Sequence, residues 1–227
     1  MKRAFICLMG LFLLVSGLYA GGNRERDGET TGDDGKGASF ERPLPPFSAI
    51  EISDHGWQNN RGREERIRVR VYASQEYRVV LYPGSNPEED LEISNSDDTL
   101  VLRLVRQTAE VYGVDLYCPA LSEITINSAA DIEFVDKMTT PSLQIDFNGA
   151  GRIRGELDCG GFQANINGAG DIDISGSSDT AMVMLNGAGR FDGLRFEIQD
   201  GTFMVNGAGV IRCWAVDTLN AYISGVG

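Results

Sequence analysis

Apolar and polar residues alternate along most of the chain from Phe40 onwards, in short runs that end at Gly, Pro, Asn or Asp. In residues 67–71, Ile and Val alternate with Arg, and a turn-like stretch at residues 95–98 precedes the apolar run at residues 100–105. A two-residue period bounded by turn residues is typical of β-strands, and no window shows a helical period. The pattern therefore predicts an all-β protein.

A repeated tetrapeptide organises the C-terminal half of the chain. Asn-Gly-Ala-Gly begins at Asn148, Asn167, Asn186 and Asn206, and a degenerate copy begins at Asn127. With Ser-Gly-Val-Gly at residue 224, the spacings are 21, 19, 19, 20 and 18 residues. When the copies are aligned, the residue before each motif is always apolar: Ile126, Phe147, Ile166, Leu185, Val205 and Ile223.

This repeat predicts a β-solenoid, in which each copy forms one coil of short strands. We expect a right-handed parallel β-solenoid, or β-helix, over residues 121–227, with coils of about 19 residues stacked about 4.8 Å apart. Residues 40–120 are expected to form an irregular β-rich N-terminal segment that packs on the solenoid or extends it.

The tetrapeptides are predicted to form the corners of the coils. Glycine permits the positive φ that a sharp corner needs. Stacked asparagines can hydrogen-bond from coil to coil. The predicted corner residues are Asn148, Gly149, Gly151, Asn167, Gly168, Gly170, Asn186, Gly187, Gly189, Asn206, Gly207 and Gly209.

Composition fits this interpretation. The chain has 28 glycines and seven prolines, and every proline lies at or before Pro141. Strands that are paired on both sides must donate their N–H groups, so proline is disfavoured among them. The period is twice that of calcium-binding nonapeptide repeats, and the residue after the motif varies among Asp, Arg and Val. We therefore expect no metal site and no cofactor.

The N-terminal region has the features of an export signal. Lys2 and Arg3 precede an apolar run at residues 4–18 and a cleavage site after Ala20, which predicts a signal peptide over residues 1–20. Residues 21–39 lack large apolar side chains and predict a disordered linker. We expect an exported protein of the periplasm, outer envelope or cell surface of a bacterium. Membrane contact is expected only if the signal segment remains uncleaved as an anchor.

Charge and cysteine content narrow the possible partners. The formal net charge of −13 argues against nucleic acid as a partner. Three cysteines remain after cleavage, Cys118, Cys159 and Cys213, and their spacing matches no zinc motif. We expect them to be structural, with one disulfide whose pairing stays open.

The order of these features resembles that of a known bacterial family. The matching segments are PFSAIEI at residues 46–52, YCPALSEITI at residues 117–126 and the serial motifs of residues 127–227. On these residues the chain resembles the autotransporter adhesin, head GIN domain family, over most of its length beyond residue 40. The resemblance implies an exported β-solenoid that serves as an adhesin or envelope-associated binding module, and it supplies no catalytic residues.

The chain also departs from the pattern of that family. The usual motif is Ser-Gly-x-Gly followed by Asp, whereas this chain has Asn-Gly-Ala-Gly, followed by Arg or Val in several copies. Family members generally continue to a closing strand after the last motif. The last coil is therefore expected to be uncapped, or the sequence to be truncated.

Few residues suggest catalysis. His55 is the only histidine, has no partner motif and is expected in an exposed loop. The alternating pairs Glu156 with Asp158 and Asp171 with Asp173 could hydrolyse glycosides or hold a metal. On a strand, however, such pairs usually form the solvated face. The short segments between motifs also leave little loop to build a pocket, so we expect no enzyme.

Two sets of residues are candidates for an interaction surface. Arg66, Arg68 and Arg70 form a basic row for which we favour ordinary surface pairing with Glu64, Glu65 and Glu76, and binding of an anionic glycan or lipid headgroup is the functional alternative. The second set makes an outward apolar patch, expected to be buried against residues 40–120 or a second copy, with a foreign ligand as the alternative. Its members are Met182, Met184, Met204 and Tyr222.

These observations favour a non-catalytic exported module that binds an envelope glycan or protein ligand, with an adhesin-like role. Two other functions remain as alternatives. The first is a structural β-solenoid that self-associates through the strand edges at its ends. The second is a carbohydrate-active β-helix enzyme.

Overall fold

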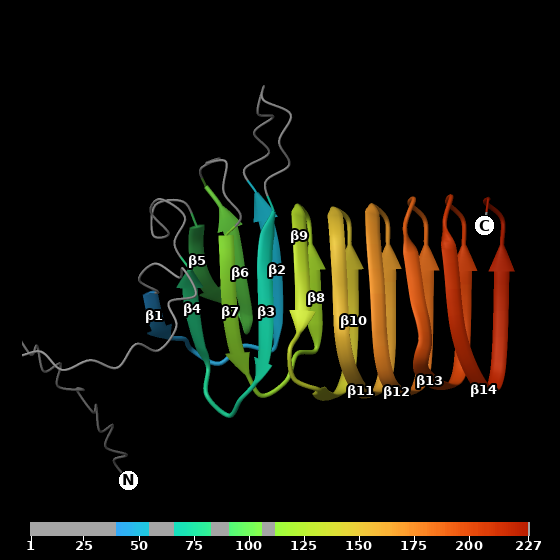
Figure 1. Ribbon diagram of the computed structural model, residues 1–227, viewed down its shortest axis with the longest axis horizontal. Helices are drawn as coiled ribbons and strands as arrows, with labels where there is room; N and C mark the ends of the chain where they lie inside the picture. The colour runs from blue at the N-terminus through green and yellow to red at the C-terminus, as the bar shows by residue number, and fades with distance from the viewer. Residues whose placement is uncertain (1–39, 55–65, 83–90, 106–111, 227) are drawn as a thin grey trace, which may run out of the picture. The chain divides into compact units, whose positions relative to one another are not determined.

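The computed structural model describes residues 40–54, 66–82, 91–105 and 112–226. The described residues are all-β, and they include no helix long and apolar enough to cross a membrane. The predictions for residues 1–20 and 21–39, and those for His55, Glu64 and Glu65, lie outside the described residues. All of the strands belong to one sheet that winds into a β-solenoid, as the repeat predicted (Figure 1).

Each coil has two long legs, and the stacked legs form two opposing faces. Face 1 consists of nine strands or first legs of strands, including its N-terminal extension. In ladder order these are β1 (Phe40–Pro43), β4 (Arg78–Tyr82), β7 (Tyr112–Cys118), β3 (Ile67–Ala73), β9 (Ala129–Phe134), and then the first legs of β11 (Ala150–Ile166), β12 (Ala169–Leu185), β13 (Arg190–Val205) and β14 (Val210–Ile223).

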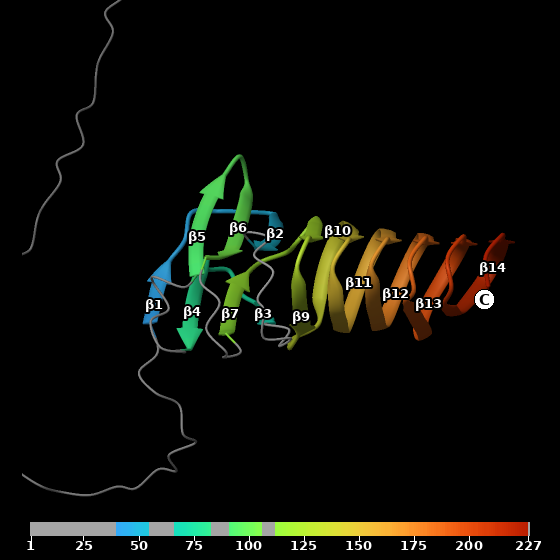
Figure 2. The same cartoon turned by 90° about the horizontal axis from the view of Figure 1, so that it is seen from above.

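Face 2 is built in the same way from the opposite legs. Its ladder runs through β5 (Leu91–Ser96), β6 (Thr99–Leu104), β2 (Ala49–Asp54), β8 (Glu123–Ile126) and the second half of β10 (Met138–Phe147). It continues through the second legs of β11, β12, β13 and β14. Seen from above, the hairpin β5–β6 and the strands β1 and β4 lie on opposite sides of the solenoid (Figure 2).

The parallel register places equivalent residues of successive coils above one another. The column that precedes each motif stacks Ile126, Phe147, Ile166, Leu185, Val205 and Ile223 in face 2. A second apolar column stacks Val69, Ile132, Ile153, Ile172, Phe191 and Ile211 in face 1. Side chains of both columns point inward and form one continuous core, because strand residues alternate between the two sides of a sheet.

The strands before β8 join the same ladders, but out of sequence order. β2 and β3 pair in parallel with β8 and β9, and β6 and β7 pair with the outer edges of β2 and β3. The later pair of strands therefore lies outside the earlier pair. Beyond them, β5 and the strands β4 and β1 add antiparallel, which ends the parallel ladder on both faces.

The corner glycines are required chiefly for close stacking, which corrects the predicted role of positive φ. Among the described corner glycines only Gly151 has a positive φ, of 137°. At Gly149, Gly168, Gly187 and Gly207, a Cβ atom would instead clash with a backbone carbonyl group of the preceding coil. The coils approach each other at these corners more closely than any side chain permits.

The corner asparagines form a hydrogen-bonded ladder. The Nδ2 atom of Asn148 donates to Oδ1 of Asn127 at 2.9 Å, and the same 2.9 Å bond recurs at each later Asn corner. At the last corner the hydroxyl of Ser224 donates to Oδ1 of Asn206 at 2.8 Å. Because each amide both donates and accepts, the ladder links every coil from β8 to β14.

The three described cysteines are free thiols, so the expected disulfide is not formed. Cys118 lies at the end of β7 in the N-terminal extension, Cys159 at the far turn of β11, and Cys213 in the first leg of β14. A disulfide requires Cα atoms about 4.4–6.8 Å apart, and cysteines in separate columns of separate coils do not meet that condition. Burial raises the pKa of the Cys118 thiol to about 12.

Candidate binding surfaces

The outward side of face 1 carries two parallel columns of charge whose sign alternates from coil to coil. The first column stacks Arg68, Asp131, Arg152, Asp171 and Arg190. The second stacks Arg70, Glu133, Arg154 and Asp173. From β3 to β12, each coil thus presents two charges of one sign, and the next coil presents two of the other. The alternation ends at β13, where Arg190 continues the first column but Asp192 stacks on Asp173 in the second.

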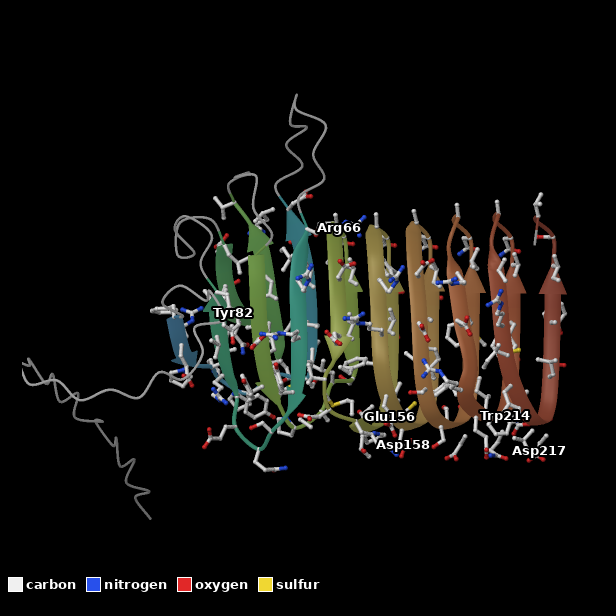
Figure 3. The ribbon with its side chains drawn as sticks, viewed as in Figure 1. Arg66, Tyr82, Glu156, Asp158, Trp214 and Asp217 are labelled. Carbon is white, nitrogen blue, oxygen red and sulfur yellow. The ribbon has the colours of Figure 1, made fainter. Side chains whose placement is uncertain are left out.

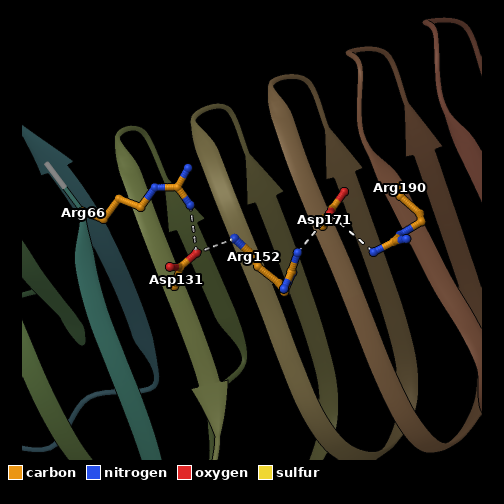
Figure 4. Close-up of polar contacts among 5 residues, drawn as sticks. All are labelled: Arg66, Asp131, Arg152, Asp171 and Arg190. Carbon is orange, nitrogen blue, oxygen red and sulfur yellow. Dashed lines mark hydrogen bonds and ion pairs between the residues drawn. The ribbon is translucent and has the colours of Figure 1, made fainter. Parts of the chain in front are cut away.

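Ion pairs connect neighbouring coils along the first column (Figure 4). Asp131 lies 3.5 Å from the guanidinium of Arg66 and accepts a 3.0 Å hydrogen bond from the backbone N–H of Arg152. Asp171 lies between two arginines, 3.6 Å from Arg152 and 3.5 Å from Arg190. These groups remain partly exposed to solvent, so each pair adds only about 0–1 kcal/mol to stability. The columns therefore arrange charge on the surface more than they stabilise the fold.

A shallow groove of about 510 Å³ lies over this part of face 1. Four arginines and three carboxylates line it, so its local charge is positive on a chain whose net charge is −13. Arg68 is exposed and has no hydrogen-bond or ion-pair partner among the described residues. The arginines of the groove are Arg66, Arg68, Arg152 and Arg154, and its carboxylates belong to Asp131, Glu133 and Asp171.

Arg70 has a different environment from the rest of the predicted basic row. Its guanidinium forms a two-point ion pair with Asp115, at 2.6 and 2.8 Å, and Asp115 is 2% exposed. The hydroxyl of Tyr82 donates to the same carboxylate at 2.7 Å, and the Tyr82 ring lies under the guanidinium (Figure 3 labels Tyr82). Desolvation and the bond to Asp115 raise the pKa of Tyr82 to about 12. Asp115 and Tyr82 therefore hold the guanidinium of Arg70, and we exclude Arg70 from the candidate binding surface.

The acidic pairs that suggested catalysis are both bound to cations. Lys137 lies 2.5 Å from Asp158 and 3.4 Å from Glu156, at the turn opposite the Asn corners (Figure 3). The hydrogen bond from Lys137 lowers the pKa of Asp158. Asp173 pairs with Arg195 at 3.3 Å, and Asp171 pairs as described above. No cluster of His, Cys, Asp and Glu in the described part of the chain has the arrangement of a metal site.

The predicted apolar patch lies on face 2, and the described strands of the N-terminal segment do not cover it. Met184, Met204 and Tyr222 stack in one column beyond Asp146 and Asn165, and Met182 lies in the adjacent outward column. Met182 is 39% exposed and Tyr222 is 60% exposed, whereas Met184 and Met204 are half-buried. Among the described residues, β2, β5 and β6 provide no such cover, because they extend the ladder in line with β8, which satisfies their backbone groups without a second layer.

Face 2 also has a hollow, of about 550 Å³. It forms where Gly161 lacks a side chain, and outward residues such as Gln144, Gln163 and Asn220 surround it. Its rim combines uncharged amides with few charges, so it offers hydrogen bonds but little electrostatic attraction. The hollow adjoins Met182, which connects it to the apolar patch.

Two features of these surfaces were missed by inspection of the sequence. The alternating signs of residues 131, 152, 171 and 190 are visible once the repeats are aligned, since these residues share one column. The partner of Arg70 is Asp115 rather than Glu76, because β3 pairs with β7. No repeat motif in the sequence predicts this strand pairing.

Comparison with known proteins identifies relatives of the fold. The family model described as "Putative auto-transporter adhesin, head GIN domain" matches residues 63–227. No curated protein matches the chain.

Solved structures with the same fold come from species of Bacteroides and Parabacteroides. A protein of Bacteroides fragilis described as a "putative adhesin" superposes with a TM-score of 0.71 at 18% identity, over 84% of this chain and 94% of that chain. A "putative adhesin" of Parabacteroides merdae gives a TM-score of 0.53 at 13% identity, over 86% and 98% of the two chains. A "putative lipid binding protein" of Parabacteroides distasonis gives 0.53 at 13% identity, over 86% and 96%. At these identities the likeness shows the shared fold alone.

Proposed function

The chain belongs to the auto-transporter adhesin family with the head GIN domain, and from this premise we propose that it is an exported, non-catalytic binding module of the bacterial envelope or cell surface. Its partner in this proposal is an anionic glycan, and the binding site is the groove of face 1. The single observation that supports the assignment most directly is the local excess of arginine there, with Arg68 unpaired among the described residues.

The chemistry of arginine suits this ligand class. A guanidinium presents several N–H donors in a plane and binds carboxylate or sulfate groups by two parallel hydrogen bonds. Arg68 stands beside Arg66, and the two positive charges together favour an anion, while Asp131 one coil away offsets part of this attraction. The carboxylates of the groove accept hydrogen bonds from sugar hydroxyls, so the alternating columns match a polymer that carries both kinds of group.

A glycan fits this surface better than a bilayer does. The large exposed apolar residues lie away from the groove, at the far turn and on the last coil, as Leu194, Trp214 and Leu219 show. A protein that inserts into lipid needs such residues around its cationic site. Because one exposed ion pair contributes only about 0–1 kcal/mol, useful affinity requires contacts with several units of an extended chain.

Binding to immobilised polysaccharides tests the proposal. The chain is expected to bind carboxylated or sulfated glycans, to bind neutral glycans weakly, and to lose affinity as salt rises. The double variant Arg66→Ser/Arg68→Ser should lose most of this binding. Arg103→Ser is the matched control, because Arg103 is an outward arginine on face 2 that pairs with Glu92 at 3.5 Å.

Two results would overturn the assignment. The first is equal binding by the double variant and the wild-type chain. The second is binding to vesicles of phosphatidylglycerol with no binding to any glycan, which would assign the arginines to a membrane surface. In both cases the measurement is made on the purified full chain.

A further inference from the structure

The hollow on the outward side of face 2 contains a glycine that packing does not require. Gly161 lies in the second leg of β11, between Ser142 of β10 and Thr180 of β12. A Cβ atom there would meet Ser142 Cβ at 3.6 Å and Thr180 Oγ1 at 3.7 Å, which are ordinary contacts. Glycine inside a strand costs stability relative to alanine, and it often marks a position where a ligand approaches the backbone. Its missing side chain leaves the floor of the hollow open.

Gln163 borders this floor with an amide group that has no partner in the fold. Strand residues alternate between the two sides of a sheet, so Gln163 is outward like Gly161 two residues before it. Its side chain is half-buried, yet it makes no hydrogen bond with any described residue. An amide carries two N–H donors and one carbonyl acceptor. Those groups are therefore available to a ligand in the hollow.

A neighbouring amide is held in a fixed orientation. Gln144 stacks beside Gln163 in the same outward column, one coil earlier. Its Nε2 donates to Oδ2 of Asp146 at 2.7 Å, and Nδ2 of Asn165 donates to the other oxygen of the same carboxylate, also at 2.7 Å. These bonds leave Oε1 of Gln144 free to accept a hydrogen bond. A group that is already fixed loses little conformational entropy when it binds.

The charges of the hollow select an uncharged ligand. The described residues that line it include the carboxylates of Glu123 and Asp200 but no lysine or arginine, so an anion is repelled. The two carboxylates belong to β8 and β13, four ladder steps of about 4.8 Å apart, and cannot hold one cationic group together. The other polar side chains there are amides and hydroxyls, which bind hydroxyl groups.

A neutral glycan fits this surface better than a peptide does. Strands β10, β11 and β12 are paired on both sides, so a peptide cannot join them as a further strand. The coil spacing of about 4.8 Å is close to the length of one sugar residue in an extended chain, so amides of successive coils can contact successive sugars. Met182, which is 39% exposed, adds an apolar contact for the C–H groups of a sugar ring.

We propose that the hollow of face 2 is a second binding site of this chain, for an uncharged stretch of glycan that lies across β10, β11 and β12. Gln163 exchanges hydrogen bonds with the hydroxyls of one sugar residue, and Oε1 of Gln144 accepts from the next. The sugar ring approaches the backbone at Gly161. The volume of about 550 Å³ is in the usual range for small-ligand sites. This site lies on the opposite face from the arginine groove and does not depend on it.

Isothermal titration calorimetry of the purified full chain tests the proposal with neutral oligosaccharides of glucose, mannose and N-acetylglucosamine as probes. At least one probe is expected to bind, weakly and without dependence on salt, because no ion pair forms. Gln163→Ala should weaken this binding by about tenfold, the loss expected for one or two hydrogen bonds. Gln199→Ala is the matched control, since it removes an amide at the far turn of β13, outside the hollow, and should bind like the wild-type chain.

Filling the floor of the hollow gives a second, independent variant. Gly161→Leu should abolish binding of the neutral probes, because its side chain occupies the space that the sugar ring needs. The contacts of a Cβ atom at Gly161 are ordinary, so the variant is expected to fold, and urea unfolding checks this. If Gly161→Leu does not fold, Gln163→Ala still decides the question, since that side chain has no partner to lose.

Three outcomes would overturn the proposal. The first is no binding of any neutral probe. The second is equal affinity of Gln163→Ala and the wild-type chain, which would place the sugar elsewhere. The third is binding of an uncharged peptide of alternating serine and glycine without binding of sugar. The double variant Arg66→Ser/Arg68→Ser should keep its neutral binding, and Gln163→Ala should keep its binding of anionic glycans, so the failure of one site is distinguishable from failure of the other.

Discussion

The close stacking of the corners predicts a large cost for the smallest possible substitution, Gly168→Ala. A Cβ atom at Gly168 would lie 2.6 Å from the carbonyl oxygen of Asn148 and still closer to that of Gly149. An ordinary contact between carbon and a carbonyl oxygen is about 3.3 Å, so the two coils must separate locally by at least roughly 0.7 Å.

Three hydrogen bonds cross this gap and would be weakened or lost. Gly168 N–H donates to Phe147 O at 3.1 Å, Ala169 N–H donates to Gly149 O at 3.0 Å, and Asn167 Nδ2 donates to Asn148 Oδ1 at 2.9 Å. An added 0.7 Å puts each beyond the usual limit of about 3.2 Å. At about 1 kcal/mol for each bond, Gly168→Ala should lower the free energy of unfolding by about 3 kcal/mol.

Gly161→Ala is the matched control, because it makes the same chemical change in an open position. A Cβ atom there would meet Ser142 Cβ at 3.6 Å and Thr180 Oγ1 at 3.7 Å, which are ordinary contacts. Urea unfolding followed by circular dichroism measures both variants, and hydrogen exchange of the coil that holds Gly168 shows whether the damage is local. Equal unfolding midpoints for the two variants would refute the stacking explanation of the corner glycines.

Other predictions concern the buried ion pair, the tyrosine beside it and the thiols. Asp115→Asn leaves Arg70 without its carboxylate and should lower the free energy of unfolding in urea by about 3 kcal/mol. Glu41→Gln removes a carboxylate from the exposed pair with Arg78 and should lower it by less than about 1 kcal/mol. Similar values for the two variants would contradict the role of burial. Tyr82 keeps its proton up to a pKa of about 12 when folded, against 10.0 when unfolded, so the folded state binds more protons between these values and stability should fall as pH rises through them. Tyr82→Phe should make that fall shallower, and an unchanged slope would be evidence against the assignment. Iodoacetamide should modify Cys213 of the native chain well before Cys118, because burial raises the pKa of Cys118 to about 12 and shields its sulfur. Mass spectrometry of the labelled peptides gives the order of modification. Early labelling of Cys118 would show that the core opens.

The repeat made the C-terminal coils predictable, because a fixed spacing determines which residues stack. Aligning Asn148 with Asn167 and Asn186 is enough to place Phe147, Ile166 and Leu185 in one inward column. The same alignment does not show how closely the corners approach, so the role of Gly168 was assigned to φ when it belongs to the clash with the preceding coil. Conformational freedom and lack of bulk both select glycine, and the sequence alone does not separate them.

The N-terminal half could not be ordered from the sequence because its strands carry no repeat. β2 lies between β8 and β6, although β6 follows it by about 50 residues in the chain, as the pairing of Ala49 with Thr99 shows. Such long-range pairing is determined by the fit of side chains rather than by a local motif. The position of Asp115 depends on this order, since β7 adds to β3 and brings the carboxylate to Arg70. Asp115 is 2% exposed because Arg70 and Tyr82 cover its carboxylate, and neither contact can be read from the sequence near it.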